Sequence, residues 1–371
     1  MRSYLVITII TIMINSSGGP DFSEKIIIDS NEICYFDIVG KNCAYIYPDG
    51  TVCVLDTNTG KIKSSFIVER FKYDEDSNTV DRLQYYDEHS QFFQISNASM
   101  PVLAVNGGEL DKEGYFYGLI DFYDLYLGKK LRTVRMKNDF GLTGLGFSGD
   151  GKYFYSCGLE SWSISCIDVK SGDIIWRSSL DFSVSDAYMR ADGKSYVIFS
   201  FSNQIAAYNK DGDVLWRIKT KDFWVRPTLQ PLEPSDVVLV FPEGGDERYE
   251  IAAMSLQDGS IMWRKPEIED QSIRSTTKDR KKQAIYMNGN MCISHYPEDK
   301  IIKIPGIKER CDAVFSQDGK TLFCLPELKR VHVNKEKLIV NRERSSHLLK
   351  IVDCNTGKIV KEIELTKPAV R

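Results

Sequence analysis

The feature that most constrains this chain is a tight turn that recurs at a fixed interval. Two copies of the turn, Phe147–Lys152 and Phe315–Lys320, read Phe-Ser-x-Asp-Gly-Lys, and a partial copy carries Gly193. The turn glycines Gly151 and Gly193 are 42 residues apart, and Gly193 and Gly319 are 126 apart, which is three times 42. This spacing predicts a structure built from repeated units of about 42 residues.

A second type of turn follows runs of apolar and β-branched residues and has the form Asp-x-x-x-Gly. Four strict copies and two looser ones occur: Asp56–Gly60, Asp124–Gly128, Asp168–Gly172, Asp353–Gly357, Tyr208–Gly212 and Ser255–Gly259. In such a turn the glycine supplies a positive φ angle, and an Asp or Asn side chain caps the backbone. Three copies have a tryptophan four residues after the glycine: Trp176, Trp216 and Trp263.

A unit of about 42 residues with four short strands and two kinds of tight turn is typical of a β-propeller blade. The Asp-Gly-Lys turn would join the innermost strand to the second, and the Asp-x-x-x-Gly turn would join the third to the outermost. We therefore predict an all-β chain that forms a seven-bladed β-propeller of four-stranded antiparallel blades. The predicted blades are residues 31–68, 69–137, 138–181, 182–222, 223–270, 271–309 and 310–365. Either residues 358–365 or residues 25–29 could supply the outermost strand of the seventh blade.

The run Cys166–Trp176 resembles the PQQ-type repeat of quinoprotein-like propellers, Ala-x-Asp-x-x-Thr-Gly-x-x-x-Trp, and Ala207–Trp216 and Ala253–Trp263 resemble it more weakly. The Asp-Gly-Lys turns are more similar to those of WD40 and YVTN-type propellers. The resemblance covers most of residues 31–365 and implies a fold rather than a chemistry. Quinoprotein dehydrogenases of this type carry a calcium site and a disulfide between adjacent cysteines over the cofactor. This chain has no adjacent cysteine pair, so we expect no quinone cofactor.

The N-terminus reads as a segment for export. One arginine precedes the apolar run Tyr4–Ile14, and small and polar residues follow it, which is typical of a secretory signal peptide. The run is too short for a helix that spans a bilayer, and no other stretch of the chain is long and apolar enough to do so. We therefore expect a signal peptide over residues 1–19, an N-terminal segment over 20–30, a single propeller domain over 31–371, and a secreted or periplasmic protein. The alternative is that the apolar run is a first β-strand and the protein is cytoplasmic.

The cysteines and the overall charge exclude some classes of protein. Most of the nine cysteines lie in strand-like runs, and none forms a CxxC pair, so we expect small buried apolar residues rather than a disulfide framework. In the hairpin around Asp49 we expect Cys43 to lie opposite Leu55. The formal net charge of −4 gives no basic field for binding nucleic acid non-specifically.

No motif in the sequence indicates catalysis. The four histidines have no metal-ligand spacing, and no Gly-x-Ser-x-Gly motif occurs. We therefore predict no catalytic residues, no metal site and no cofactor, and we favour a non-enzymatic binding or scaffold protein. The alternative is an enzyme that acts at the mouth of the central channel, either a lactonase-like hydrolase or a remote quinoprotein relative.

Three long insertions would emerge on the face opposite the two Asp-Gly turns. They are the acidic residues 69–90, residues 106–114 and the basic residues 326–347. Since the seventh blade neighbours the first, the acidic and basic insertions would lie close together, either to neutralise each other or to bind a protein partner. We expect a monomeric propeller that binds this partner through Trp162, Lys329, Arg330, Arg342 and Arg344.

Overall fold

The structure is a computed structural model, and the chain folds into strands and turns throughout its described part. The described residues are 25–28, 32–33, 35–47, 49–68, 93–96, 100–110, 116–137, 142–148, 150–158, 163–181, 184, 186–189, 195–199, 204–219, 228–231, 237–241, 250–266, 271–277, 281–295, 300–316, 318–327, 329–334 and 339–368. Among them, no helix is long and apolar enough to cross a membrane.

The described residues form seven four-stranded antiparallel sheets, numbered here in chain order. The first three are β2 (Tyr35–Val39), β3 (Asn42–Ile46), β4 (Thr51–Asp56) and β5 (Ile62–Ile67); β6 (Phe93–Ile95), β7 (Val102–Leu110), β8 (Phe116–Asp124) and β9 (Lys130–Lys137); and β10 (Leu142–Phe147), β11 (Tyr153–Gly158), β12 (Ser163–Asp168) and β13 (Ile174–Ser179). The fourth and fifth are β14 (Asp186–Met189), β15 (Ser195–Phe199), β16 (Gln204–Asn209) and β17 (Val214–Lys219); and β18 (Thr228–Pro231), β19 (Val237–Phe241), β20 (Glu250–Ser255) and β21 (Ile261–Pro266).

The sixth sheet keeps the same order, whereas the seventh is interrupted by an insertion. The sixth is β22 (Gln271–Thr276), β23 (Lys282–Met287), β24 (Asn290–His295) and β25 (Lys300–Lys303). The seventh is β26 (Cys311–Phe315), β27 (Thr321–Pro326), β30 (Leu348–Asp353) and β31 (Ile359–Glu364). Its outermost strand is therefore β31, which answers the question that the sequence left open. The insertion lies between β27 and β30.

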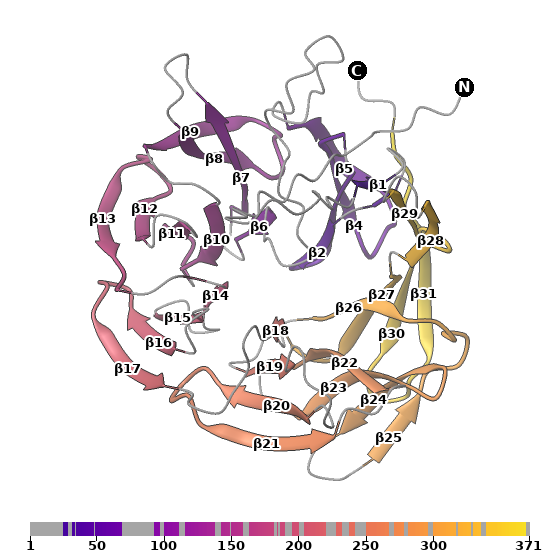
Figure 1. Ribbon diagram of the computed structural model, residues 1–371. Helices are drawn as coiled ribbons and strands as arrows, with labels where there is room; N and C mark the ends of the chain where they lie inside the picture. Colours follow the sequence, from indigo (N-terminus) through magenta and orange to yellow (C-terminus); the bar gives the residue numbers. More distant parts are fainter. Residues whose placement is uncertain are drawn as a thin grey trace.

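The sheets follow one another around a common centre, with β10 and β14 near the centre and β13 and β17 at the periphery (Figure 1). Each of six hydrophobic clusters in the described residues combines side chains from two neighbouring sheets. One of these clusters joins the first sheet, through residues such as Tyr45, to the last, through residues such as Leu349. Several four-stranded antiparallel sheets packed face to face are consistent with the predicted all-β propeller architecture.

Both kinds of turn form where the sequence predicts them in the described residues, whereas the copy at Gly193 lies outside those residues. In the Asp-Gly-Lys turns, Gly151 and Gly319 donate their N–H groups to the carbonyls of Ser148 and Ser316. In the first sheet, the carboxylate Oδ1 of Asp56 accepts the backbone N–H groups of Asn58 and Thr59, each at 2.9 Å. Gly60, with a φ of 74°, donates its N–H to the carbonyl of Asp56 at 2.7 Å. The short aspartate side chain thus caps the turn, and the glycine adopts the left-handed backbone conformation that the turn requires, as the sequence pattern implies.

The strand register agrees with the sequence pattern. Cys43 lies opposite Leu55 across β3 and β4, as predicted for the hairpin around Asp49. The eight cysteines in the described residues are all free and buried. Their packing therefore matches the expectation of small apolar core residues rather than a disulfide framework.

A β-bulge recurs in the outermost strand of six of the sheets, always three residues after the turn glycine. In β13 the extra residue is Ile175, and in β17 it is Leu215. Because a bulge re-aims the side chain that follows it, the residue four after the glycine can reach the neighbouring sheet. Trp176 and Trp216 occupy this position.

Each of these two tryptophans joins its own sheet to the next. The indole Nε1–H of Trp176 donates to the carbonyl of Lys210 at 2.9 Å, and that of Trp216 donates to Gln257 at 2.9 Å. Both acceptors stand two residues before the glycine of the next turn. The rings lie against Gly212 and Gly259, where an added Cβ atom would meet them at 3.5 Å and 2.9 Å. Trp176 and Trp216 therefore have a packing role.

A lysine makes the equivalent contact between the last sheet and the first. Lys361 stands four residues after Gly357, and its Nζ donates to the carbonyls of Thr57, at 2.9 Å, and Asn58. Asn58 is again two residues before a turn glycine, Gly60. The contact that joins successive sheets through tryptophan therefore also joins the two ends of the series, with an ammonium group as the donor.

We predict that Lys361→Met, which retains the aliphatic part of the side chain, lowers the free energy of unfolding by about 1 kcal/mol, because two turn carbonyls lose their donor. Urea unfolding at constant slope measures the change. The control is Lys358→Met, an exposed lysine in the neighbouring turn, which should change the stability by less than about 0.5 kcal/mol. Equal effects of the two substitutions would contradict the assigned role of Lys361.

Candidate functional site

The insertion in the seventh sheet folds into a small sheet of its own. Its strands β28 (Lys329–Asn334) and β29 (Ile339–Glu343) form an antiparallel hairpin. The N-terminal strand β1 (Lys25–Ile28) pairs with β29 in parallel, so that the order is β1-β29-β28 (Figure 1). We call this element the accessory sheet. The sequence predicts an insertion here, but it does not predict that the N-terminal strand β1 pairs with this insertion.

Three of the five predicted binding residues belong to the accessory sheet. Lys329 and Arg330 lie on β28, and Arg342 lies on β29. The register places Arg330 directly opposite Arg342 and Lys329 opposite Glu343. The structure therefore brings these three cationic residues together on two adjacent strands.

The other predicted features are described only in part. Trp162 and residues 69–90 lie outside the described residues. Of the insertion over residues 106–114, the first five residues extend strand β7, which pairs with β8 as far as Leu110 opposite Phe116. That part of the insertion is a lengthened hairpin.

Arg344, the fifth predicted binding residue, is buried, with a side chain only 2% exposed. Its Nε donates to the carbonyl of Ile33 at 2.8 Å, and its Nη1 donates to Asp312 Oδ2 at 2.7 Å and to the carbonyl of Pro326. The sequence predicts Arg344 to be a surface residue that contacts a partner, whereas the structure buries its side chain in contacts within the protein. The guanidinium has five fixed donors, which suit it to joining carbonyl and carboxylate groups from separate segments.

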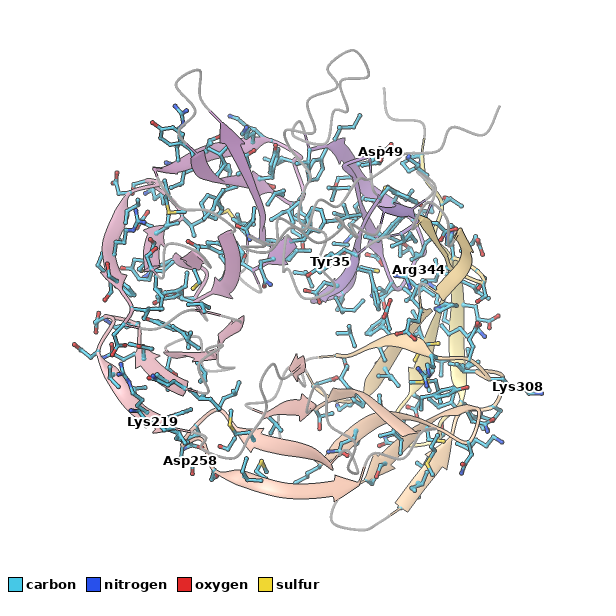
Figure 2. All side chains as sticks on the ribbon, viewed as in Figure 1. Tyr35, Asp49, Lys219, Asp258, Lys308 and Arg344 are labelled. Carbon is cyan, nitrogen blue, oxygen red and sulfur yellow. The ribbon has the colours of Figure 1, made fainter. Side chains whose placement is uncertain are left out.

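Further polar contacts surround Arg344 at the base of the accessory sheet. The carboxylate of Glu32 accepts the backbone N–H of Arg344 and lies 3.0 Å from His347 Nε2. Next to Arg344, the hydroxyl of Ser345 donates to Glu309 at 2.5 Å. Together these bonds fasten the segment that follows β1 and the end of the insertion to the seventh sheet. Figure 2 shows Arg344 in the region where the first and last sheets meet.

One carboxyl on an innermost strand has an altered acidity. Asp37 lies on β2, where its carboxylate accepts the backbone N–H of Ile38 at 2.6 Å and faces the hydroxyl of Tyr35 at 3.4 Å. Burial raises the pKa of Asp37 to about 6, although both hydrogen bonds oppose this shift. The sequence gives no reason to single out this residue. Within the part of the chain that the structure describes, no three His, Cys, Asp or Glu side chains gather in a way that could hold a metal ion.

The aspartates of the turns are engaged in structural bonds. A hydrogen bond from Lys63, followed by those from the turn backbone, lowers the pKa of Asp56 to about 2. The hydroxyl and backbone N–H of Thr356 lower the pKa of Asp353 in the equivalent turn of the seventh sheet. These carboxylates are ionised at neutral pH and hold the turns together. Their hydrogen bonds and lowered pKa values are therefore explained by a structural role.

We predict that Arg344→Met lowers the free energy of unfolding by about 2–4 kcal/mol, because buried carbonyls of two segments lose their donor. The matched control is Lys308→Met, an exposed lysine at the periphery in Figure 2, with an expected change below about 0.5 kcal/mol. Urea unfolding measures both changes. An Arg344 variant as stable as the Lys308 variant would show that the buried network contributes nothing.

Comparisons with known proteins agree with the repeat pattern. A family model of PQQ-type repeats, described as outer membrane protein assembly factor BamB, matches residues 135–322, which is half of the chain. No curated protein matches the sequence. One similar solved structure is hydrazine synthase from Kuenenia stuttgartiensis, with 14% identity, a TM-score of 0.44, and coverage of 76% of this chain and 80% of that one.

Another similar structure is the computationally designed Ika8 protein, with 11% identity, a TM-score of 0.50, and coverage of 91% of this chain and 89% of that one. At this identity the likeness concerns the fold alone. The family match covers the third to sixth sheets and thereby the three tryptophan-containing repeats. It confirms the resemblance to quinoprotein-like propellers that the repeats indicate. The chain belongs to the PQQ-type repeat family described as outer membrane protein assembly factor BamB.

Proposed function

We propose that this protein is a non-enzymatic scaffold that binds a partner protein on the face carrying the accessory sheet. Its body is a seven-bladed β-propeller, in which each four-stranded sheet is one blade. Support for seven blades comes from the seven four-stranded sheets of the described residues and from the hydrophobic cluster that the first and last sheets share. Support for monomeric closure comes from Lys361, which makes the blade-to-blade contact within one chain.

The observation that carries the proposal is the contrast between the repeated residues and the accessory sheet. Turn aspartates such as Asp56, turn glycines such as Gly212, and Trp176 and Trp216 take part in contacts that build the blades. The accessory sheet lies outside the blades and has no counterpart among the described strands of the other repeats. A rigid body that presents one added element is a common arrangement for binding, because function resides in the elements grafted onto a fold.

The family description supports the same class of function. It names an assembly factor for outer membrane proteins, which is a role in handling other proteins. We carry this role to the present chain as a proposal: it holds a protein partner during assembly. The proposed contact residues are Trp162, Lys329, Arg330 and Arg342. Arg344 has a structural role, because its buried side chain anchors the end of the accessory sheet to the seventh sheet.

We predict that the triple reversal Lys329→Glu, Arg330→Glu and Arg342→Glu strongly lowers capture of partner proteins from an envelope extract of the host. The reason is that the charge of the proposed contact surface is inverted. The measurement is cross-linking followed by quantitative mass spectrometry, at low and at high salt. The difference between wild type and variant should shrink at high salt, since screening weakens the contribution of exposed charges.

The matched control reverses three exposed lysines in turns on the opposite face: Lys41, Lys129 and Lys170. It changes the net charge by the same amount and should leave partner capture intact. Equal capture by wild type and by the triple reversal of the accessory sheet would exclude this surface as the contact. Equal losses in both triple variants would mean that only total charge matters.

We also propose that the protein is exported and that residues 1–19 are removed as a signal peptide. The sequence of the N-terminus motivates this, and the family description of an outer membrane assembly factor agrees with export. We predict that N-terminal sequencing of the protein isolated from its own host finds a first residue close to position 18–20. An N-terminus at Met1 or Arg2 would contradict the proposal.

A further inference from the structure

We propose that β28 binds an extended acidic segment of the partner protein, which adds to the accessory sheet as a further strand. The inference rests on the function proposed above, because it names the kind of partner that the same surface takes. Three features of the accessory sheet carry it: an edge strand, a local excess of positive charge and a firmly anchored base.

The first feature is the position of β28 in the sheet order β1-β29-β28. Within the described residues, β28 has a hydrogen-bonded neighbour on one side only, so a row of its backbone groups faces away from β29. An extended peptide can pair with such an edge through main-chain hydrogen bonds. The opposite edge of the same hairpin already holds an added strand, because β1 pairs with β29 over four residues in parallel.

The second feature is the charge of the hairpin. Its two strands carry Lys329, Arg330 and Arg342 against the single acidic residue Glu343. The register pairs Lys329 with Glu343 but sets Arg330 opposite Arg342. An added strand that carries carboxylates would complement this excess of positive charge. The complementary segment is therefore acidic.

The same charge argues against a second copy of this chain as the occupant. Two β28 edges brought together would combine two strands that each carry Lys329 and Arg330 and no acidic residue. Cationic residues on an edge strand are a known means of preventing pairing between copies. An acidic strand from a different protein meets no such barrier, so the edge discriminates between the two occupants.

The third feature is the anchoring of the hairpin. Arg344 directly follows β29, and its buried guanidinium bonds to Ile33, Asp312 and Pro326, which belong to three separate segments. The accessory sheet is therefore fixed to the body of the protein at its base. A pre-organised acceptor strand binds more tightly, because less conformational freedom is lost on binding.

The test uses a fluorescein-labelled peptide, Glu-Thr-Glu-Val-Glu-Thr-Glu-Val with blocked ends, and the full-length protein. Fluorescence anisotropy at low salt measures the dissociation constant. We expect saturable binding that weakens about tenfold or more in the variant Lys329→Glu/Arg330→Glu. The turn-face variant Lys41→Glu/Lys170→Glu should bind as wild type does. A peptide with lysine in place of each glutamate should not bind.

Two further peptides separate strand pairing from simple charge attraction and require no protein variant. One carries N-methyl groups on the even-numbered residues and the other on the odd-numbered residues, so that each loses one row of backbone donors. The expected result is that at least one of them binds about tenfold or more weakly than the parent. Equal binding of all three acidic peptides would overturn the proposal, as would equal binding to wild type and to the Lys329/Arg330 variant.

The outcomes also distinguish this inference from the proposed function. If the triple reversal lowers partner capture while N-methylation has no effect on peptide binding, the surface binds a partner by charge alone and only the strand proposal fails. If the triple reversal leaves capture unchanged, the proposed binding surface itself is wrong. Self-association of the wild-type protein in light scattering, lost in the Lys329/Arg330 variant, would identify a second copy as the occupant and overturn the acidic-partner proposal.

Discussion

One kind of hydrogen bond, found at three junctions between neighbouring sheets in the described residues, fixes how those sheets fit together. A side chain four residues after a turn glycine donates to a backbone carbonyl in the turn of the following sheet, as Trp176 and Trp216 do. The bond depends on the β-bulge one residue earlier, which re-aims the donor, and on the glycine of the receiving turn, which leaves room for the ring. Sheets that are joined in this way bury their faces against each other and leave their outer edges at the periphery.

Much of this architecture could be predicted from the sequence because its determinants are local. A turn of five residues with aspartate and glycine at its ends is visible in the sequence, and so is the tryptophan that follows it. The opposition of Cys43 and Leu55 followed from counting along one hairpin. The contact of Lys361 is not predictable from the sequence, because its partner, Thr57, is 304 residues away and a lysine in a polar strand resembles any solvated lysine.

The candidate site was predictable only in outline. The position of the insertion and its positive charge were evident, since they interrupt a regular repeat. The burial of Arg344 was not, because it depends on Ile33, Asp312 and Pro326, which come together only when the first and last sheets meet. The pairing of β1 with β29 is equally remote in sequence. Periodicity identifies the repeats, but it carries no information about which segments an irregular element binds.

The pairing of β1 with β29 also has a consequence for the order of folding. During synthesis β1 precedes its partner strand by more than three hundred residues, so neither the accessory sheet nor the bonds of Arg344 to Ile33 can form until almost the whole chain is available. Contacts between such distant segments require closure of a very long loop and are intrinsically slow to form. The sheets between them can assemble from neighbour to neighbour in the meantime. The N-terminal strand is thus among the first parts of the protein to be made and the last to find its place.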